Sequence, residues 1–343
     1  MVVGNRNRCM DTIKGIACLF VVFIHYNWSN DVSETIKAIG RFAVPYFFFV
    51  SGYHLPDRTG ALESATIRRK LVHLLKMMAK AAIVYSIFCV FWNYSMDSSW
   101  NWMDFIRNEI TWWSAVKIFL TCDPLVYAHF WYLIALVLCY LVIWGLGEKP
   151  GRTGYLILFV VLLCGYSLLA EFKNLVGWKN SFQISGTKNM VLSNLFVLRA
   201  LPFVLYGICL RKYNIAERRK IPFALLLVLI ILGCLLAMLE QKRYGIILMY
   251  TGNHLMVIAM ALMSIWYPQR RLFVLEYVGN RLSMNVYLYH IAAGKLLDLL
   301  ATKMHLWDSF YRSLRPVCAL AVSLLTAQLL AMVVNLRKQK LKD

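Results

Sequence analysis

The sequence predicts an all-α, polytopic membrane protein with about ten transmembrane helices and both termini in the cytoplasm. The first observation behind this prediction is composition. Hydrophobic residues make up 60% of the 343 residues and charged residues only 16%, whereas soluble domains carry about 25% charged residues. The second observation is that the apolar residues form long runs, which reach the ~20 residues needed to cross a bilayer. Together they exclude a soluble enzyme, a disordered chain and a secreted disulfide scaffold.

The apolar runs predict the helices in order along the chain. The ninth is the least regular, because Asn285, His290, Lys295 and Asp298 interrupt it. The first run has no small-residue cleavage site after it, so we expect it to stay as a membrane anchor. No loop has room for a separate soluble domain, so residues 1–343 are expected to form a single transmembrane domain. The predicted spans are 12–28, 38–55, 72–94, 129–147, 155–170, 191–210, 221–239, 245–266, 282–301 and 314–336.

The predicted orientation depends on where the cations lie. Lys and Arg number 37 against 17 Asp and Glu, which gives a formal charge of +20. Cytoplasmic loops of membrane proteins carry such an excess of Lys and Arg. The charge is therefore explained by topology, and no nucleic-acid partner is expected. Most of the loop cations lie between alternate spans, at 6–8, 58–70, 149–152, 211–220, 270–271 and 337–342, and this side is assigned to the cytoplasm.

The longest loop on the opposite side, 95–128, is rich in aromatic residues. One interpretation is an aromatic belt at the level of the lipid headgroups, on an interfacial helix. The other is a platform on which sugar rings stack, and the two interpretations are compatible. The residues concerned are Trp100, Trp102, Phe105, Trp112 and Trp113.

Ionisable residues inside the first predicted span indicate a site, because charges in hydrocarbon are costly and usually functional. Asp11, Lys14 and His25 share one helix face, since His25 lies only ~20° beyond three full turns from Lys14 and ~16 Å further along the axis. Imidazole is the side chain best suited to move a proton near neutral pH. The alternatives are an interfacial ion pair of Asp11 with Lys14 and a packing role for His25.

A second basic stripe enters the third predicted span. Its members are spaced four, three and four residues apart, which places them on one narrow helix face. Such a face fits a phosphate-bearing ligand from the cytoplasm, because Arg binds phosphate through its planar fork and Lys as a point charge. Alternatively, the lysines extend back to the headgroups. The stripe is Arg69, His73, Lys76 and Lys80, with Arg68 beside its base.

The N-terminal segment CMDTIKGIACLFVVFIH resembles the opening motif of the integral-membrane acyltransferase family 3, typified by O-acetyltransferases of bacterial surface polysaccharides. That motif has an Asp, an Arg three residues on, and a His after ten more residues. The matching positions here are Asp11, Lys14 and His25. Lys14 stands in place of the Arg, so the positive charge is kept and the planar fork is lost.

Five more segments resemble the family in order over nearly the whole chain. VPYFFFVSGYHL is similar to its second helix and IRRKLVHLLK to the basic helix start that follows. HFWYLIALVLCYL, LRALPFVLYGICL and YVGNRLSMNVYLYH are similar to its Trp-aromatic-Leu helix, its Arg-to-Gly helix and its penultimate helix. The resemblance makes six residues of these segments candidates for substrate contact: Ser51, Tyr53, Trp131, Arg199, Tyr287 and His290.

What the resemblance implies is transfer of an acyl group, most often acetyl, from cytoplasmic acyl-coenzyme A to a hydroxyl of a glycan or lipid-linked sugar. His25 would be the general base or transiently the acyl acceptor, and Asp11 and Lys14 would orient the stripe and contact the donor. Arg68, Arg69 and the rest of the basic stripe would hold coenzyme A phosphates. Acetyl-CoA is expected as the acyl donor, which is a substrate, and no metal is expected. The resemblance is compatible with a monomer or an oligomer. The expected location is the bacterial inner (cytoplasmic) membrane, as a multi-pass protein.

Two other classes of function stay open at this point. A membrane transporter of a small anion or a lipid-linked sugar would also need charged residues and a histidine within its spans. A non-catalytic membrane domain that keeps this fold would tolerate the Lys14 substitution. Release of coenzyme A thiol by the purified protein separates an enzyme from both.

Overall fold

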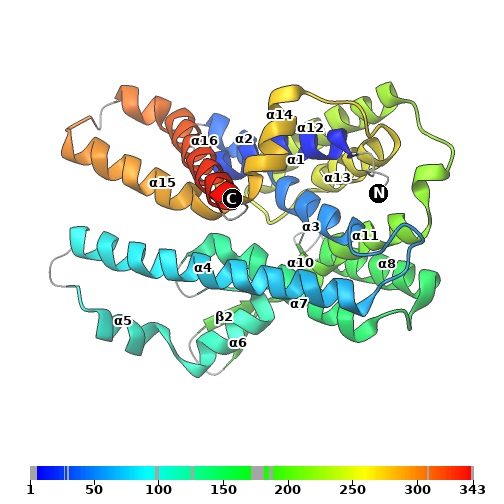
Figure 1. Cartoon of the computed structure of the whole chain (residues 1–343), viewed down its shortest axis with the longest axis horizontal. Coiled ribbons are helices and arrows are strands. Elements are labelled where there is room, and N and C mark those ends of the chain that lie inside the picture. The colour runs from blue at the N-terminus through cyan, green and yellow to red at the C-terminus, as the bar shows by residue number, and fades with distance from the viewer. Residues whose placement is uncertain are drawn as a thin grey trace. The chain divides into compact units, whose positions relative to one another are not determined.

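The computed structural model describes residues 6–26, 28, 31–96, 100–124, 127–170, 181–184, 188–306 and 309–340 (Figure 1). The chain divides into two compact units. One consists of Met1–Phe47 with Ala216–Asp343, and the other of Phe48–Ile215. Both belong to one all-α, polytopic membrane protein, and each has its own buried side chains.

The first unit joins the two ends of the chain. Its N-terminal part holds α1 (Arg8–His25), α2 (Asp31–Gly40) and the start of α3 (Ala43–Tyr53). Its C-terminal part holds α12 (Phe223–Tyr244), α13 (Thr251–Trp266), α14 (Phe273–Tyr277), the π-helix η4 (Val278–Leu282), α15 (Ser283–Lys303) and α16 (Ser309–Lys340).

The second unit contains the middle of the chain. It holds the end of α3, α4 (Ser64–Met96), α5 (Trp102–Glu109), α6 (Trp112–Thr121), η1 (Ala128–Phe130), α7 (Trp131–Leu146) and α8 (Gly151–Ala170). A two-stranded antiparallel hairpin of β1 (Ser181–Ile184) and β2 (Lys188–Val191) pairs Ser181 with Val191. After it come η2 (Leu192–Asn194), α10 (Phe196–Arg199), α11 (Leu201–Lys212) and the turn η3 (Ile215–Glu217) at the boundary of the unit.

Five helices in the described part of the chain are long and apolar enough to cross a membrane. They confirm five of the predicted spans, those at 72–94, 129–147, 155–170, 221–239 and 314–336. Another, α13, is apolar but shorter. The five segments are Ser64–Met96, Ala128–Leu146, Gly151–Ala170, Phe223–Tyr244 and Ser313–Val334.

Two of the predicted spans are wrong as continuous helices. The segment 38–55 is divided by a turn at Arg41 and Phe42, where the Arg41 guanidinium donates to the Leu248 carbonyl oxygen over 2.9 Å. The segment 191–210 begins as a strand and then breaks at Ala200. Pro202 explains this second break, because proline lacks an amide hydrogen and fits only the first turn of a new helix.

Helix α1 is the centre of the first unit, because it contacts α2, α13, α14, η4, α15 and α16. Gly15 on α1 and Gly279 on η4 let two backbones meet directly. A Cβ at Gly15 would overlap the carbonyl oxygen of Leu275, and a Cβ at Gly279 would overlap that of Asp11. Only glycine permits this approach, which holds the N-terminal half of α1 against α14 and η4.

Substituting Gly15 by Ala tests this contact. We expect the free energy of unfolding to fall by about 1–3 kcal/mol, because the added methyl group must displace backbone atoms of α14. The measurement is thermal unfolding of the purified protein in detergent. Gly145→Ala on α7 is the matched control, since a Cβ there meets nothing within 4 Å. Equal melting temperatures for the two variants would contradict the packing argument.

Candidate functional site

The start of α1 is held in place by backbone and side-chain contacts. The Asn7 side chain caps the helix by accepting from the Met10 amide over 2.9 Å, and its amide group donates to the Ser264 carbonyl oxygen over 2.7 Å. The backbone amides of Arg8 and Cys9 donate to the Pro268 carbonyl oxygen. Helix α1 therefore starts at Arg8, four residues before the predicted span, and its charged first turns are part of the fold.

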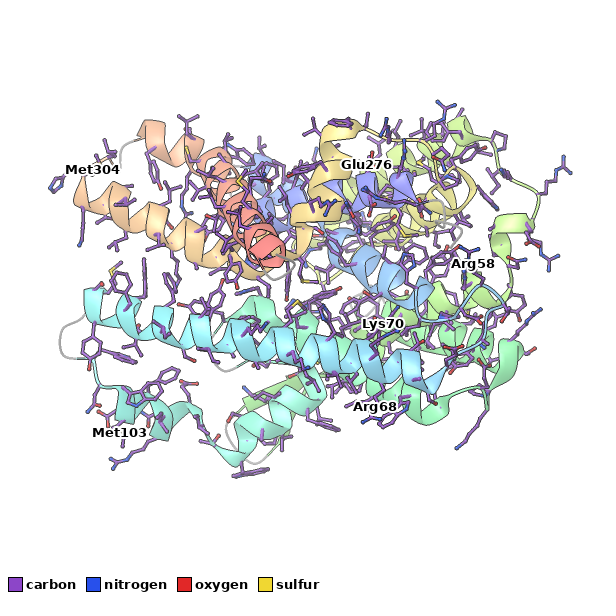
Figure 2. The ribbon with its side chains drawn as sticks, viewed as in Figure 1. Arg58, Arg68, Lys70, Met103, Glu276 and Met304 are labelled. Atoms are coloured by element: carbon purple, nitrogen blue, oxygen red, sulfur yellow. The ribbon has the colours of Figure 1, made fainter. Side chains whose placement is uncertain are left out.

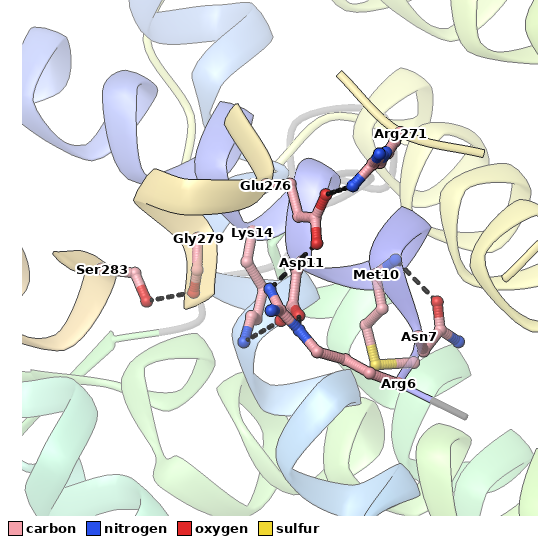
Figure 3. A network of polar contacts seen from close by, with 9 residues as sticks. All are labelled: Arg6, Asn7, Met10, Asp11, Lys14, Arg271, Glu276, Gly279 and Ser283. Atoms are coloured by element: carbon pink, nitrogen blue, oxygen red, sulfur yellow. Dashed lines mark hydrogen bonds and ion pairs between the residues drawn. The ribbon is translucent and has the colours of Figure 1, made fainter. Parts of the chain in front are cut away.

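Asp11 lies at the centre of a charge network at this end of α1 (Figure 3). The Lys14 ammonium is 2.7 Å from one oxygen of the carboxylate, so the predicted ion pair is present. The other oxygen accepts from Nε of Arg6, also at 2.7 Å. Asp11 is buried, and burial of a carboxylate without such partners would cost several kcal/mol.

Arg6 extends the network to α14. Its terminal nitrogen lies 3.2 Å from the Glu276 carboxylate, which also accepts from Arg271 at 3.4 Å (Figure 3). Glu276 is buried. Three cations thus face two carboxylates, so this end of α1 carries a net positive charge. From the sequence, Arg6 and Arg271 are expected only as loop cations, and Glu276 is not singled out; a lone acid in the apolar segment 272–278 was the available signal.

The π-helix η4 begins two residues after Glu276 and lies against the same part of α1. The Ser283 hydroxyl donates to the Gly279 carbonyl oxygen over 2.7 Å, which satisfies a backbone group of the wider turn. Single π turns inside α-helices are rare and occur frequently at functional sites. This turn links the charge network to α15, the helix that carries Tyr287 and His290.

The other end of α1 brings two histidines together. His25 is the last residue of α1, and its ring centroid lies 5.0 Å from that of His290 on α15. The His25 side chain is exposed, whereas His290 is fully buried. Tyr287 is one turn away, with its ring centroid 6.5 Å from that of His290. The structure therefore brings three of the predicted site residues into one cluster.

The contacts of His290 indicate which nitrogen carries its hydrogen. Its Nδ1 lies 3.0 Å from the Val286 carbonyl oxygen and 2.9 Å from that of Tyr287. Both oxygens are acceptors, so the geometry assigns the hydrogen to Nδ1. In the neutral ring the nitrogen without a hydrogen is then Nε2.

A second charge cluster lies beside the histidines. Arg315 on α16 forms a two-pronged ion pair with Asp298 on α15, at 2.8 and 2.7 Å. The Tyr311 hydroxyl donates to the same carboxylate over 3.2 Å, and Arg315 lies over the Tyr26 ring at 5.2 Å from its centroid. The Tyr26 hydroxyl donates to the Ile291 carbonyl oxygen over 2.9 Å. These contacts tie the C-terminal end of α1 to α15 and α16.

The predicted basic stripe lies in the second unit, on α4. The buried residues of α4, such as Ile67, Leu71 and Leu74, occupy one side of the helix, and the cations occupy the opposite side. Ala65 and Val72 complete the lining of an open hollow of about 430 Å³. The stripe residues that line this hollow are Arg68, Arg69, His73 and Lys76, while Lys80 lies beyond them on the exposed side.

The loop before α4 is held by its own polar contacts. The Asp57 carboxylate accepts from the Thr59 hydroxyl and from the Thr59 and Ala61 amides, at 2.7 to 2.9 Å. These hydrogen bonds, led by that of the Thr59 hydroxyl, hold the pKa of Asp57 below its usual value. The Lys70 ammonium donates to the His54 carbonyl oxygen. Figure 2 labels Arg58, Arg68 and Lys70 in this region, where cations gather at the start of α4.

The remaining predicted residues form three contacts within the second unit. The Arg199 guanidinium lies over the Trp131 ring, 3.6 Å from its centroid, so this predicted pair is brought together. Ser51 lies 3.5 Å from the Tyr132 hydroxyl. Tyr53 accepts from Arg211 over 3.4 Å, with that guanidinium 5.3 Å from its ring centroid. The sequence reasoning treated Arg211 only as a loop cation. His25 and His290 belong to the other unit.

Comparison with known families identifies the chain. A family described as an acyltransferase domain matches residues 7–334, essentially the whole chain. The protein therefore belongs to the acyltransferase family 3, and with its apolar helices it is a multi-pass membrane acyltransferase. No curated protein and no solved structure gives a match.

Substituting Arg6 by Ala tests the charge network of α1. We expect the unfolding free energy to fall by about 1 kcal/mol, because a half-exposed arginine then no longer bridges Asp11 and Glu276. Lys14→Arg in that background is expected to restore part of the loss, since a guanidinium can contact two oxygens. Thermal unfolding in detergent measures both effects.

Arg8→Ala is the control for this test. It removes the same charge two residues away, and among the described residues no ion pair to the Arg8 side chain is present. If Arg8→Ala lowers the melting temperature as much as Arg6→Ala, the bridge has no specific role.

Proposed function

We propose that the protein is a membrane O-acyltransferase, which moves an acyl group, most simply acetyl, from cytoplasmic acyl-CoA to a hydroxyl of a surface glycan or lipid-linked sugar. The observation that carries this proposal is the pair of imidazoles at the end of α1, 5.0 Å apart, in a chain of this family. An exposed histidine backed by a buried one suits proton transfer to and from a substrate.

His25 acts as the general base in this proposal. Its imidazole takes the proton of the acceptor hydroxyl while the oxygen attacks the thioester carbonyl carbon. The carbon–sulfur bond then breaks, and the coenzyme A thiolate leaves and receives the proton from the imidazolium. His290, with its hydrogen held on Nδ1 by two carbonyl oxygens, presents Nε2 as a second proton acceptor behind His25. Tyr287 contacts the acceptor from the same helix.

Asp11 and Lys14 orient α1. Both oxygens of the Asp11 carboxylate are already engaged by Lys14 and Arg6, and His25 lies 14 residues further on, or ~21 Å along the axis. The charge network therefore acts on the reaction by holding α1, and its excess positive charge attracts the anionic donor.

The donor binds at the hollow on α4. Coenzyme A carries several phosphate charges, and four of the stripe side chains converge there without a carboxylate in the lining. Arg68 and Arg69 match phosphate oxygens through planar forks, and Lys76 adds a point charge. Lys80 would contact the donor further along α4. Ser51, Tyr53, Trp131 and Arg199 contribute polar and aromatic contacts to the substrates.

The topology completes the proposal. An orientation with both termini in the cytoplasm, in a bacterial inner membrane, places the cationic loops on the side where acyl-CoA is made. The distribution of Lys and Arg supports this orientation. No metal takes part in the proposed reaction, and an oligomer is compatible with it.

Replacing His25 tests the chemistry. We expect His25→Ala to lower coenzyme A thiol release in the presence of an acceptor by about 100- to 10,000-fold, the usual contribution of a general base. His290→Ala is expected to have a smaller effect, because His25 remains. The measurement uses purified protein and radiolabelled acetyl-CoA, with product followed by mass spectrometry.

A loss of folded protein would also lower thiol release, so the melting temperatures of the variants are compared with that of the parent protein. His305→Ala is the control substitution, because His305 is exposed and lies 15 residues beyond His290, past the end of α15. Transfer at the parent rate by well-folded His25→Ala would remove the base assignment. Transport of the labelled donor without any product would favour a transporter.

The donor site has its own test. Arg69→Ala combined with Lys76→Ala should weaken coenzyme A binding about tenfold, since each exposed ion pair contributes up to about 1 kcal/mol. Isothermal titration calorimetry measures the affinity. Lys80→Ala removes a cation from the same face outside the hollow and should have the weaker effect. Unchanged affinity in the double variant would exclude this hollow as the donor site.

A further inference from the structure

Two cavities of opposite character adjoin in the second unit, away from the basic stripe. The first has a volume of about 210 Å³ and an almost entirely carbon lining, with Met78, Tyr85, Ile118, Phe130 and Ile134 among its walls. The second is a polar hollow of about 70 Å³ on α6 and the residues beside it. Pro124 lines both, so the two spaces adjoin.

The apolar cavity is preformed by packed aromatic rings. Tyr85 is 1% exposed, and its ring centroid lies 4.7 Å from that of Tyr127 and 5.0 Å from that of Phe130. An apolar cavity offers water too few polar partners to hold it. Four of the eight wall residues come from α4 and two from Ala128–Leu146, and both segments are long and apolar enough to cross a membrane. A hydrocarbon chain is therefore the occupant that fits.

The polar hollow has the chemistry of a carbohydrate site. Glu109, Asp123 and Asn108 supply acceptors for hydroxyl groups, and Trp113 supplies an aromatic ring. Lys117 is the cation of its lining and lies 3.8 Å from Asp123. Two carboxylates against one ammonium repel the anionic phosphate of an ordinary bilayer lipid, whereas they favour a neutral group rich in hydroxyls.

The helices around the hollow are suited to the membrane surface. Trp112 and Phe119 on α6 are 71% and 61% exposed, and Met103 on α5 is 57% exposed (Figure 2). Exposed aromatic and apolar residues on short helices are typical of the headgroup level of a bilayer. The polar hollow then lies at headgroup depth, and the carbon-lined cavity lies at the depth of the lipid tails.

We propose that these two cavities form a binding site for a glycolipid, with its hydrocarbon tail between α4, α6 and α7 and one edge of its sugar in the polar hollow. This identification of the ligand as the acceptor rests on the proposed function. Together they imply that the acyl acceptor is a lipid-linked sugar. A free glycan has no hydrocarbon chain that could occupy the carbon-lined cavity.

The test uses dodecyl glucoside with a diazirine at the end of its tail as the probe. Full-length protein in nanodiscs is irradiated with the probe, and crosslinked peptides are identified by mass spectrometry. We expect crosslinks within 78–86 of α4 and around Ile134 of α7. Excess dodecyl glucoside should compete, and excess dioleoyl phosphatidylglycerol should not.

Ala82→Trp fills the apolar cavity, which Ala82 lines. We expect crosslinking at these sites to fall about tenfold, because each excluded methylene lowers affinity roughly fourfold. Ile87→Trp is the matched control: Ile87 is 67% exposed and points to another side of α4, so crosslinking should be unchanged. Glu109→Gln with Asp123→Asn should weaken selectivity for the glucoside over phosphatidylglycerol.

Crosslinks spread evenly over the apolar helices, or lost equally in Ala82→Trp and Ile87→Trp, would overturn the proposal. Equal competition by phosphatidylglycerol would make this a site for bilayer lipid and would also overturn it. Thiol release with dodecyl glucoside as the acceptor is measured in parallel. Its loss in Ala82→Trp together with the crosslinking supports both proposals, whereas its absence in the parent protein with crosslinking intact refutes only the acyltransfer chemistry.

Discussion

The direct contact of α1 with α14 and η4, at Gly15 and Gly279, determines the geometry of the first unit. It presses the backbone at Asp11 against η4, so the Asp11 carboxylate is fixed where Lys14 and Arg6 can reach it. Because η4 continues into α15, the same contact also sets the position of His290 relative to α1. A rigid helix transmits this placement over ~21 Å to His25. One close approach of two backbones therefore positions both ends of the polar face of α1.

In this unit each buried carboxylate has a cationic partner, and two imidazoles meet between α1 and α15. Asp11 and Asp298 each have cationic partners at 2.7 Å, which offsets the cost of placing carboxylates among apolar helices. A neutral imidazole needs no such counter-charge. The charge networks therefore anchor the two ends of α1, and the two histidines meet between α1 and α15. In the second unit, α4 lines an open cationic hollow near its start and a carbon-lined cavity near its middle.

Prediction from sequence succeeded where one segment contains its own signal. Long apolar runs identified five spans, and helical spacing placed the basic stripe on one face and Asp11 beside Lys14. Prediction failed where the backbone bends inside an apolar run, at Arg41 and at Ala200. Hydropathy does not reveal such a turn, because the turn depends on a hydrogen bond to a distant carbonyl oxygen in one case and on a proline in the other. Prediction also missed Arg6 with Glu276 and Arg211 with Tyr53, since these partners are far apart in the chain.

By itself, the sequence determined the membrane class, the family and the helix faces that carry charge, because composition, order of motifs and helical period are local properties. The tertiary structure alone decided that His25 meets His290, that Arg6 bridges two carboxylates, and that a polar hollow adjoins a carbon-lined cavity at Pro124. The physical reason is that each of these depends on the distance between side chains on different helices. That distance is set by how closely the backbones pack, which residues such as Gly15 and Gly279 control without any chemistry of their own.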